Sequence, residues 1–201
     1  MKKAIITFIS LLIFGVTFSQ NIDIQLLKHI NLNRNVSLDP SMRLLSNTTT
    51  EICIGLPVAM TAYSFLKKDS LNFRKSAVIC ATVVTSAAVT YILKHAINRD
   101  RPFVRYPSID QAISVSSASF PSGHTSNSFA LATSLSLAYP KWYVIAPSYL
   151  WASSVVYSRL HLGVHYPSDI LGGVIIGVGS AYLNHKLNKL LANRRLAQKI
   201  F

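Results

Sequence analysis

Three short clusters of polar residues stand out in a chain that is otherwise largely apolar. The first is Lys94-His95-Ala96-Ile97-Asn98-Arg99-Asp100-Arg101-Pro102. Lys94 and Arg101 are seven residues apart, so they share a face if a helix continues through both, and Pro102 would then end that helix. Taken alone, the cluster is typical of cations that reach out from the apolar end of a helix.

The second cluster is Pro121-Ser122-Gly123-His124-Thr125, which directly precedes an apolar run. A Ser-Gly pair at the start of a helix exposes backbone N–H groups that can hold an anion with help from the helix dipole. His124 can donate or accept a proton near neutral pH. An ordinary N-cap by Ser122 explains the same pattern equally well.

The third cluster runs from Ser158 and Arg159 to His165 and Asp169. His165 and Asp169 are four residues apart, which is one helical turn, so the carboxylate can accept an imidazole N–H. The other ring nitrogen is then unprotonated, as in an oriented histidine nucleophile or base. A purely structural ion pair is the alternative.

Together the clusters offer a set of groups suited to phosphate. Lys94, Arg101 and Arg159 can neutralise phosphate oxygens, which arginine can bind with two hydrogen bonds. His124 and His165 can act on opposite sides of phosphorus in an in-line displacement. The sequence has no cysteine or carboxylate cluster with metal-ligand spacing, so it predicts no metal cofactor.

Apolar runs must position these clusters. Five follow the N-terminal segment, at residues 52–66, 76–93, 126–139, 142–157 and 170–183. As helices they span about 20 to 27 Å, which is short of a hydrocarbon core of ~30 Å. Buried helices of a soluble bundle therefore remain an alternative to membrane spans.

The charge distribution favours the membrane. Half of the 201 residues are hydrophobic, only 13% are charged, and the net charge is +13, which excludes a disordered chain. If residue 21 lies outside the cytoplasm, alternating spans place twelve of the twenty basic residues inside, as the positive-inside rule expects. These twelve are Lys2, Lys3, Lys67, Lys68, Arg74, Lys75, Lys141, Lys186, Lys189, Arg194, Arg195 and Lys199. No continuous basic stripe remains for a nucleic acid.

The sequence therefore predicts an all-α integral membrane bundle with five mature transmembrane helices, or six if the N-terminal segment is uncleaved. Residues 1–19 are typical of a signal peptide or signal anchor. Residues 20–50 form an extracytoplasmic amphipathic segment, either a short helix on the membrane surface or a solvated loop. Residues 51–185 form the helical catalytic domain, and residues 186–201 a basic cytoplasmic tail.

The three clusters also carry a resemblance to a known family. The pattern Lys-x6-Arg-Pro, Pro-Ser-Gly-His and Ser-Arg-x5-His-x3-Asp resembles the signature of the type 2 phosphatidic acid phosphatase (PAP2) family. The motif positions match from Lys94 to Asp169, in order and without a departure. The resemblance implies a metal-independent phosphatase.

It also implies a role for each motif residue. His165 would attack phosphorus to form a phosphohistidine, Asp169 would orient it, and His124 would protonate the leaving oxygen and later activate water. The remaining positions would bind phosphate or stabilise the transition state: Lys94, Arg101, Arg159, Ser122 and the Gly123 N–H.

Four residues near the motifs are predicted to contact the substrate head group: Arg99, Asp100, Arg105 and Tyr166. We interpret His95 and His161 as surface or packing residues.

Members of the family act on phosphatidic acid, phosphatidylglycerophosphate, undecaprenyl diphosphate or lipid A. The apolar runs favour such a lipid phosphate, hydrolysed at the outer face of a bacterial inner membrane. A soluble secreted acid phosphatase of the same superfamily is the main alternative, because a signal peptide and short helices also fit it. A non-catalytic lipid-phosphate binding protein is a third possibility, disfavoured by the intact His124, His165 and Asp169.

Overall fold

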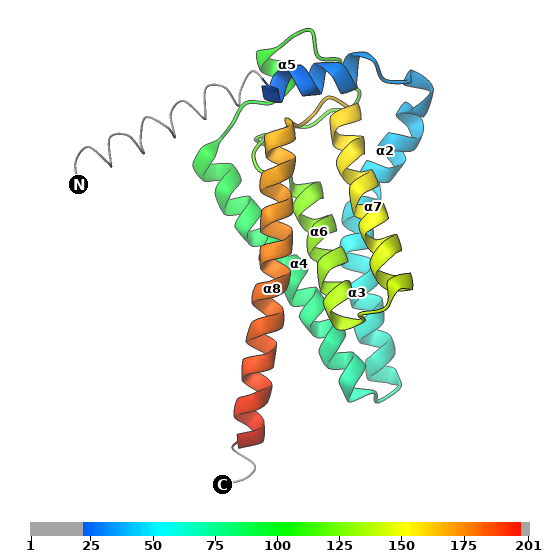
Figure 1. Cartoon of the computed structure of the whole chain (residues 1–201), viewed down its shortest axis with the longest axis vertical. Coiled ribbons are helices and arrows are strands. Elements are labelled where there is room, and N and C mark those ends of the chain that lie inside the picture. The colour runs from blue at the N-terminus through cyan, green and yellow to red at the C-terminus, as the bar shows by residue number, and fades with distance from the viewer. Residues whose placement is uncertain (1–21, 198–201) are drawn as a thin grey trace, which may run out of the picture.

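The computed structural model describes residues 22–197, so the predicted signal segment lies outside the described residues. Within that range all regular secondary structure is helical, as predicted. In chain order the elements are a helix over residues 22–32, η1 (Val36–Leu38), α2 (Asp39–Asn47), α3 (Thr49–Leu66), α4 (Ser70–Ile97), α5 (Pro102–Arg105), α6 (Gly123–Ala138), α7 (Trp142–His161) and α8 (Pro167–Ala197). Figure 1 shows α3, α4, α6, α7 and α8 running alongside one another as a bundle.

The five long helices coincide with the five apolar runs, but most extend well beyond them. α4 has 28 residues and α8 has 31, which correspond to about 42 Å and 46 Å. Polar residues at the run ends continue the helices, because backbone hydrogen bonding does not depend on apolar side chains. The basic tail expected from residue 186 begins inside α8, which continues to Ala197.

The bundle has small polar side chains inside and large apolar side chains outside. Fully or nearly buried hydroxyl residues include Ser76, Thr82, Ser86, Thr90, Ser126, Ser128, Thr133 and Ser134. Exposed apolar residues include Ile54, Phe65, Leu66, Val84, Ile92, Trp142, Leu150, Leu171 and Ile175. Small residues between helices are typical of membrane bundles, and a soluble bundle rarely exposes so much apolar surface.

Two helical stretches are long and apolar enough to cross a membrane by length and composition alone. They are Val36–Leu66 and Ser70–Arg105. The expected count of five spans therefore stays a prediction.

Glycines on α8 allow it to pack closely against α6, and the two helices lie side by side in Figure 1. A Cβ atom on Gly177 would lie 2.3 Å from the Ser126 carbonyl oxygen and 2.8 Å from the Ala130 nitrogen. A Cβ atom on Gly173 would lie 2.8 Å from the Ser122 carbonyl oxygen. This contact fixes the start of α6, which carries the second motif, against the first half of α8, which carries Asp169 of the third.

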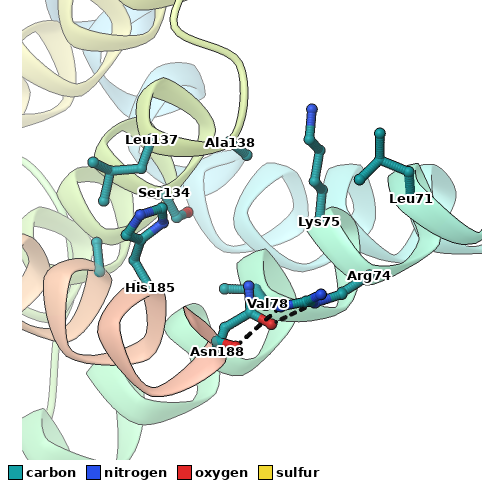
Figure 2. Close-up of a pocket in the computed structure, with 10 residues that line it drawn as sticks. Leu71, Arg74, Lys75, Val78, Ser134, Leu137, Ala138, His185 and Asn188 are labelled. Carbon is teal, nitrogen blue, oxygen red and sulfur yellow. Dashed lines mark hydrogen bonds between the residues drawn. The ribbon is translucent and has the colours of Figure 1, made fainter. Parts of the chain in front are cut away.

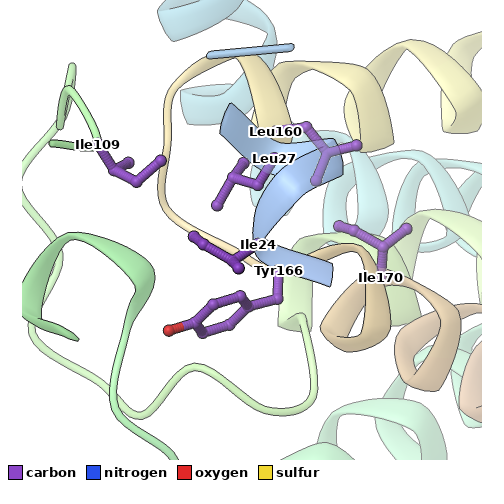
Figure 3. Packing of buried hydrophobic residues seen from close by; sticks show 6 residues of the cluster. All are labelled: Ile24, Leu27, Ile109, Leu160, Tyr166 and Ile170. Atoms are coloured by element: carbon purple, nitrogen blue, oxygen red, sulfur yellow. The ribbon is translucent and has the colours of Figure 1, made fainter. Parts of the chain in front are cut away.

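The N-terminal segment caps one end of the bundle. Residues 22–32 are helical, which decides between the helix and the loop that the sequence left open. Ile24 and Leu27 are buried in a cluster with Ile109, Leu160, Tyr166 and Ile170, which Figure 3 shows. Leu26 and Ile22 are exposed on the opposite side of this helix. The segment is therefore anchored to the same end of the bundle as the three motifs.

Candidate active site

The first motif is built on a turn and not on a continuous helix. Lys94 lies in the last turn of α4, which ends at Ile97. Asn98 takes the left-handed conformation, with φ 44°, and its N–H bonds to the Lys94 carbonyl. The predicted helical face shared by Lys94 and Arg101 is therefore wrong, because a left-handed C-cap ends the helix first. Pro102 begins α5 instead of ending α4.

The turn nevertheless brings Arg101 inside. Its guanidinium is buried, and it is fixed by bonds from Nε to the Ser117 carbonyl (2.7 Å) and from Nη1 to the Val164 carbonyl (2.8 Å). Nη1 also lies 3.4 Å from Nε2 of His165. Lys94 donates to the Ala118 carbonyl. Both cations are thus held by neutral carbonyls, which leave their positive charges available to an anion.

The second motif opens α6 at Gly123. Gly123 and His124 both line the cavity described below. The Ser122 hydroxyl points elsewhere: it accepts a hydrogen bond from Thr125 Oγ1 (3.0 Å), makes no side-chain cap, and is absent from the cavity lining. The Ser122 N–H donates to the Asp169 carbonyl (3.0 Å), which ties the second motif to the third.

The third motif places His165 in the turn between α7 and α8. Its Nδ1 lies 3.4 Å from Oδ2 of Asp169, the pair that the four-residue spacing predicts. Burial lowers the pKa of His165 to about 3, although the Asp169 hydrogen bond opposes that shift. At neutral pH the imidazole is therefore uncharged, with Nδ1 directed to Asp169 and Nε2 to the side of Arg101.

Asp169 is fully buried and is bonded on both oxygens. Oδ1 accepts from Arg99 Nη1 (2.6 Å), and Oδ2 accepts from the Ser119 hydroxyl and the Tyr166 N–H (2.9 Å). These bonds fix the carboxylate behind His165.

Arg159 comes from the last turn of α7 and is almost completely buried. Its Nη1 donates to the hydroxyl of Ser46 in α2. A second contact holds α2 against α7, because the buried His161 Nε2 lies 2.7 Å from Asp39 Oδ1. Arg34 also bonds Asp39. His161 is thus a packing residue, and the exposed His95 is a surface residue, as predicted.

The three motifs meet around a cavity of about 400 Å³. Its lining residues are Thr49, Thr50, Lys94, Arg101, Val115, Ser116, Ser117, Gly123, His124, Asn127, Arg159 and His165. Six of the eight predicted site residues therefore surround one space, Asp169 supports it from behind His165, and Ser122 stands outside it. Three cations face two histidines there, and no acidic residue lines the space.

Several residues at the site were not predicted. Thr49, Thr50 and Asn127 line the cavity but carry no recognisable spacing signal. Arg99 was predicted as a head-group contact, yet its Nη1 bonds Asp169 and its Nη2 bonds Asp23 (2.9 Å). Asp23 also accepts from the Ser168 N–H at the start of α8 (2.7 Å). Arg99 therefore links the N-terminal helix to the carboxylate that orients His165.

The other predicted head-group contacts also lie outside the cavity. Tyr166 is buried in the apolar cluster, and the Arg99 guanidinium stacks 3.9 Å from its ring centroid. Arg99 and Asp100 line a separate hollow of about 190 Å³ beyond residues 115–117. Arg105 is exposed in α5. Within the described residues, no group of three or more His, Cys, Asp or Glu side chains is placed to hold a metal ion.

A buried imidazole, held by a carboxylate and lining the same cavity as three cations, is chemically suited to a phosphate substrate. The comparisons agree with this class. The sequence profile of the PAP2 superfamily matches residues 75–191. The chain is 31% identical over 194 residues to a lipid A 4'-phosphatase of Bacteroides thetaiotaomicron, covering 88% of this chain and 83% of that protein. It is 28% identical to an undecaprenyl-diphosphatase of Sulfolobus acidocaldarius, covering 90% and 86%.

Solved structures have the same fold. A transmembrane PAP2-type phosphatidylglycerolphosphate phosphatase of Bacillus subtilis superposes with a TM-score of 0.73 at 25% identity, covering 94% of this chain and 97% of that one. LpxE of Aquifex aeolicus superposes with a TM-score of 0.72 at 24% identity, covering 82% and 95%. The chain belongs to the PAP2 superfamily and is a phosphatase.

Proposed function

We propose that this protein hydrolyses a lipid phosphate monoester or diphosphate through a phosphohistidine on His165. The observation that carries the proposal is the cavity that Lys94, Arg101 and Arg159 line together with an oriented, uncharged imidazole, whose Nε2 lies 3.4 Å from Arg101. A phosphoryl group bound by these cations lies next to the nitrogen that has a free lone pair.

In the first step, Nε2 of His165 attacks phosphorus while the bond from phosphorus to the leaving oxygen breaks. His124 gives its proton to that oxygen. The imidazolium-like charge that develops on His165 is stabilised by Asp169, which accepts the Nδ1 hydrogen. In the second step, His124 takes a proton from water, the oxygen of that water attacks phosphorus, and the N–P bond breaks. Inorganic phosphate leaves, and both histidines return to their starting states.

The lipid part of the proposal rests on an apolar groove next to the cavity. The groove has a volume of about 400 Å³, and its lining residues are Ile52, Leu56, Leu131, Ala132, Leu135, Tyr143, Val144, Pro147, Ser148 and Trp151. It shares α3, α6 and α7 with the cavity: Thr49 leads to Ile52 on α3, and Asn127 leads to Leu131 on α6, each about one turn further along. An acyl or prenyl chain attached to a bound phosphate would extend along α3 and α6 onto this apolar surface.

The apolar exterior of the bundle supports a membrane location over the soluble acid phosphatase. With the basic loops in the cytoplasm, the phosphate cavity opens on the outer side of a bacterial inner membrane. The first candidate substrates are lipid A, undecaprenyl diphosphate and phosphatidylglycerophosphate, because relatives of this chain are phosphatases of these lipids. Phosphatidic acid is the fourth candidate.

A phosphate-release panel with these four lipids on the purified protein tests the proposal. We expect release from at least one lipid, unchanged by EDTA and abolished in His165→Ala. Turnover that survives in His165→Ala would refute the phosphohistidine mechanism. Carbonate washing of membranes separates the alternatives, since it leaves an integral enzyme in the pellet and releases a soluble one.

A further inference from the structure

A second pocket lies far from the phosphate cavity, between the N-terminal part of α4, the end of α6 and the C-terminal half of α8. Its volume is about 250 Å³. Its lining residues are Leu71, Arg74, Lys75, Val78, Ser134, Leu137, Ala138, Ala181, His185 and Asn188. We call it the far pocket. Figure 2 shows Arg74 joined to Asn188 and His185 close to Ser134 and Leu137.

The basic side chains of the far pocket are held in place by neutral groups. Arg74 donates from Nε to the Asn188 side-chain oxygen (2.8 Å) and from Nη2 to the Asn188 carbonyl (3.0 Å). Lys75 Nζ lies 4.6 Å from the centroid of the Tyr139 ring. None of these partners carries a negative charge, and neither Arg74 nor Lys75 forms an ion pair within the described residues, although Lys75 contributes to lowering the pKa of Asp69.

Acidic residues are scarce at this end of the molecule. Six of the seven in the sequence lie in the active-site half: Asp23, Asp39, Glu51, Asp100, Asp110 and Asp169. The seventh, Asp69, caps α4 and is bonded to the Asn72 N–H (3.0 Å) and side-chain amide (2.7 Å). No acidic residue lines the far pocket, which combines two fixed cations and His185 with an apolar wall.

We propose that the far pocket binds an anionic phospholipid, with the head group on Arg74, Lys75 and His185 and a chain along Leu71, Val78 and Leu137. Basic pockets between helices on the cytoplasmic side of a membrane suit such lipids, since the charge of the head group and the apolar chain are both complementary. The inference rests on the membrane location in the proposed function, and is independent of the chemistry in the phosphate cavity.

The test is competition between phosphatidylglycerol and phosphatidylcholine with identical chains, measured by native mass spectrometry on the full-length protein in detergent. We expect a preference for phosphatidylglycerol that falls about thirtyfold in Arg74→Gln/Lys75→Gln, from the loss of two basic contacts. Lys67→Gln/Lys68→Gln is the matched control, because it removes the same charge at the same end outside the pocket lining. It should keep the preference.

Three results would overturn the inference: no preference in the wild type, equal loss in both double variants, or displacement of the lipid by excess inorganic phosphate. If Arg74→Gln/Lys75→Gln fails to fold, Ala138→Phe narrows the apolar wall without removing charge and should still weaken lipid binding. Phosphate release should stay near wild type in all these variants. If the wild-type protein released no phosphate from any of the lipids, that result would instead count against the proposed function.

Discussion

Replacing Arg99 tests whether this residue positions the Asp169 carboxylate or contacts the substrate. Arg99 bonds Asp169, Ser168 and Asp23 and stacks on the Tyr166 ring. In Arg99→Gln, the buried Asp169 carboxylate loses its charged partner Arg99. It keeps the hydrogen bonds that it accepts from the Ser119 hydroxyl and from the Tyr166 N–H. The expected variant is therefore folded, with a less firmly oriented carboxylate behind His165.

The structure gives the size of the effect. A hydrogen bond to a charged group contributes about 1.5–3 kcal/mol, and the Arg99 side chain is 28% exposed, so we take the lower half of that range for the bond to Asp169. If about 1.5–2.2 kcal/mol of orientation is expressed in the transition state, kcat falls roughly 10- to 40-fold. KM should change little, because Arg99 does not line the phosphate cavity.

The assay is steady-state phosphate release from a lipid phosphate in detergent, together with the thermal midpoint. Arg105→Gln is the control, since it removes one exposed positive charge six residues further along the chain, at the end of α5, without touching Asp169. Arg99→Lys should recover part of kcat through the charge alone. A raised KM with an unchanged kcat in Arg99→Gln would refute the reasoning and make Arg99 a substrate contact.

Three further predictions concern other parts of the molecule. Asp169→Asn should lower kcat while leaving substrate binding largely intact, and equal loss of both would make Asp169 purely structural. Gly177→Val should destabilise the fold by about 2–3 kcal/mol or more by overpacking against the α6 backbone, as measured by thermal unfolding, whereas Gly179→Val, which has open space, should not. His165 is buried uncharged with a pKa of about 3, so the unfolded chain binds more protons as pH falls below about 6.5 and the folded state loses stability there. The thermal midpoint of His165→Gln should therefore fall less than that of the wild type when the pH is lowered from 7.5 to 5. An equal fall in both proteins would contradict this prediction.

Most of the reactive groups could be predicted from the amino-acid sequence alone. Residue type and spacing predicted the His165–Asp169 pair, because four residues make one helical turn wherever α8 lies. The apolar runs predicted the five long helices, since a continuous apolar segment of that length is either a buried or a lipid-facing helix. The same reasoning failed at Arg101, where the left-handed Asn98 ended α4 before the second turn.

Only the tertiary structure decided which groups meet across the chain. Arg99 reaches both Asp23 and Asp169, which are 76 and 70 residues away, and no local period encodes such contacts. Asn127 enters the cavity from α6, whose start is fixed by close packing against α8 at Gly173 and Gly177, and Thr49 enters it from α3. The sequence by itself determined the reactive groups and the helices that carry them, which depend on short-range periodicity. The partners that orient those groups depend on how the helices pack, and so do the apolar groove beside the cavity and the far pocket at the other end of the bundle.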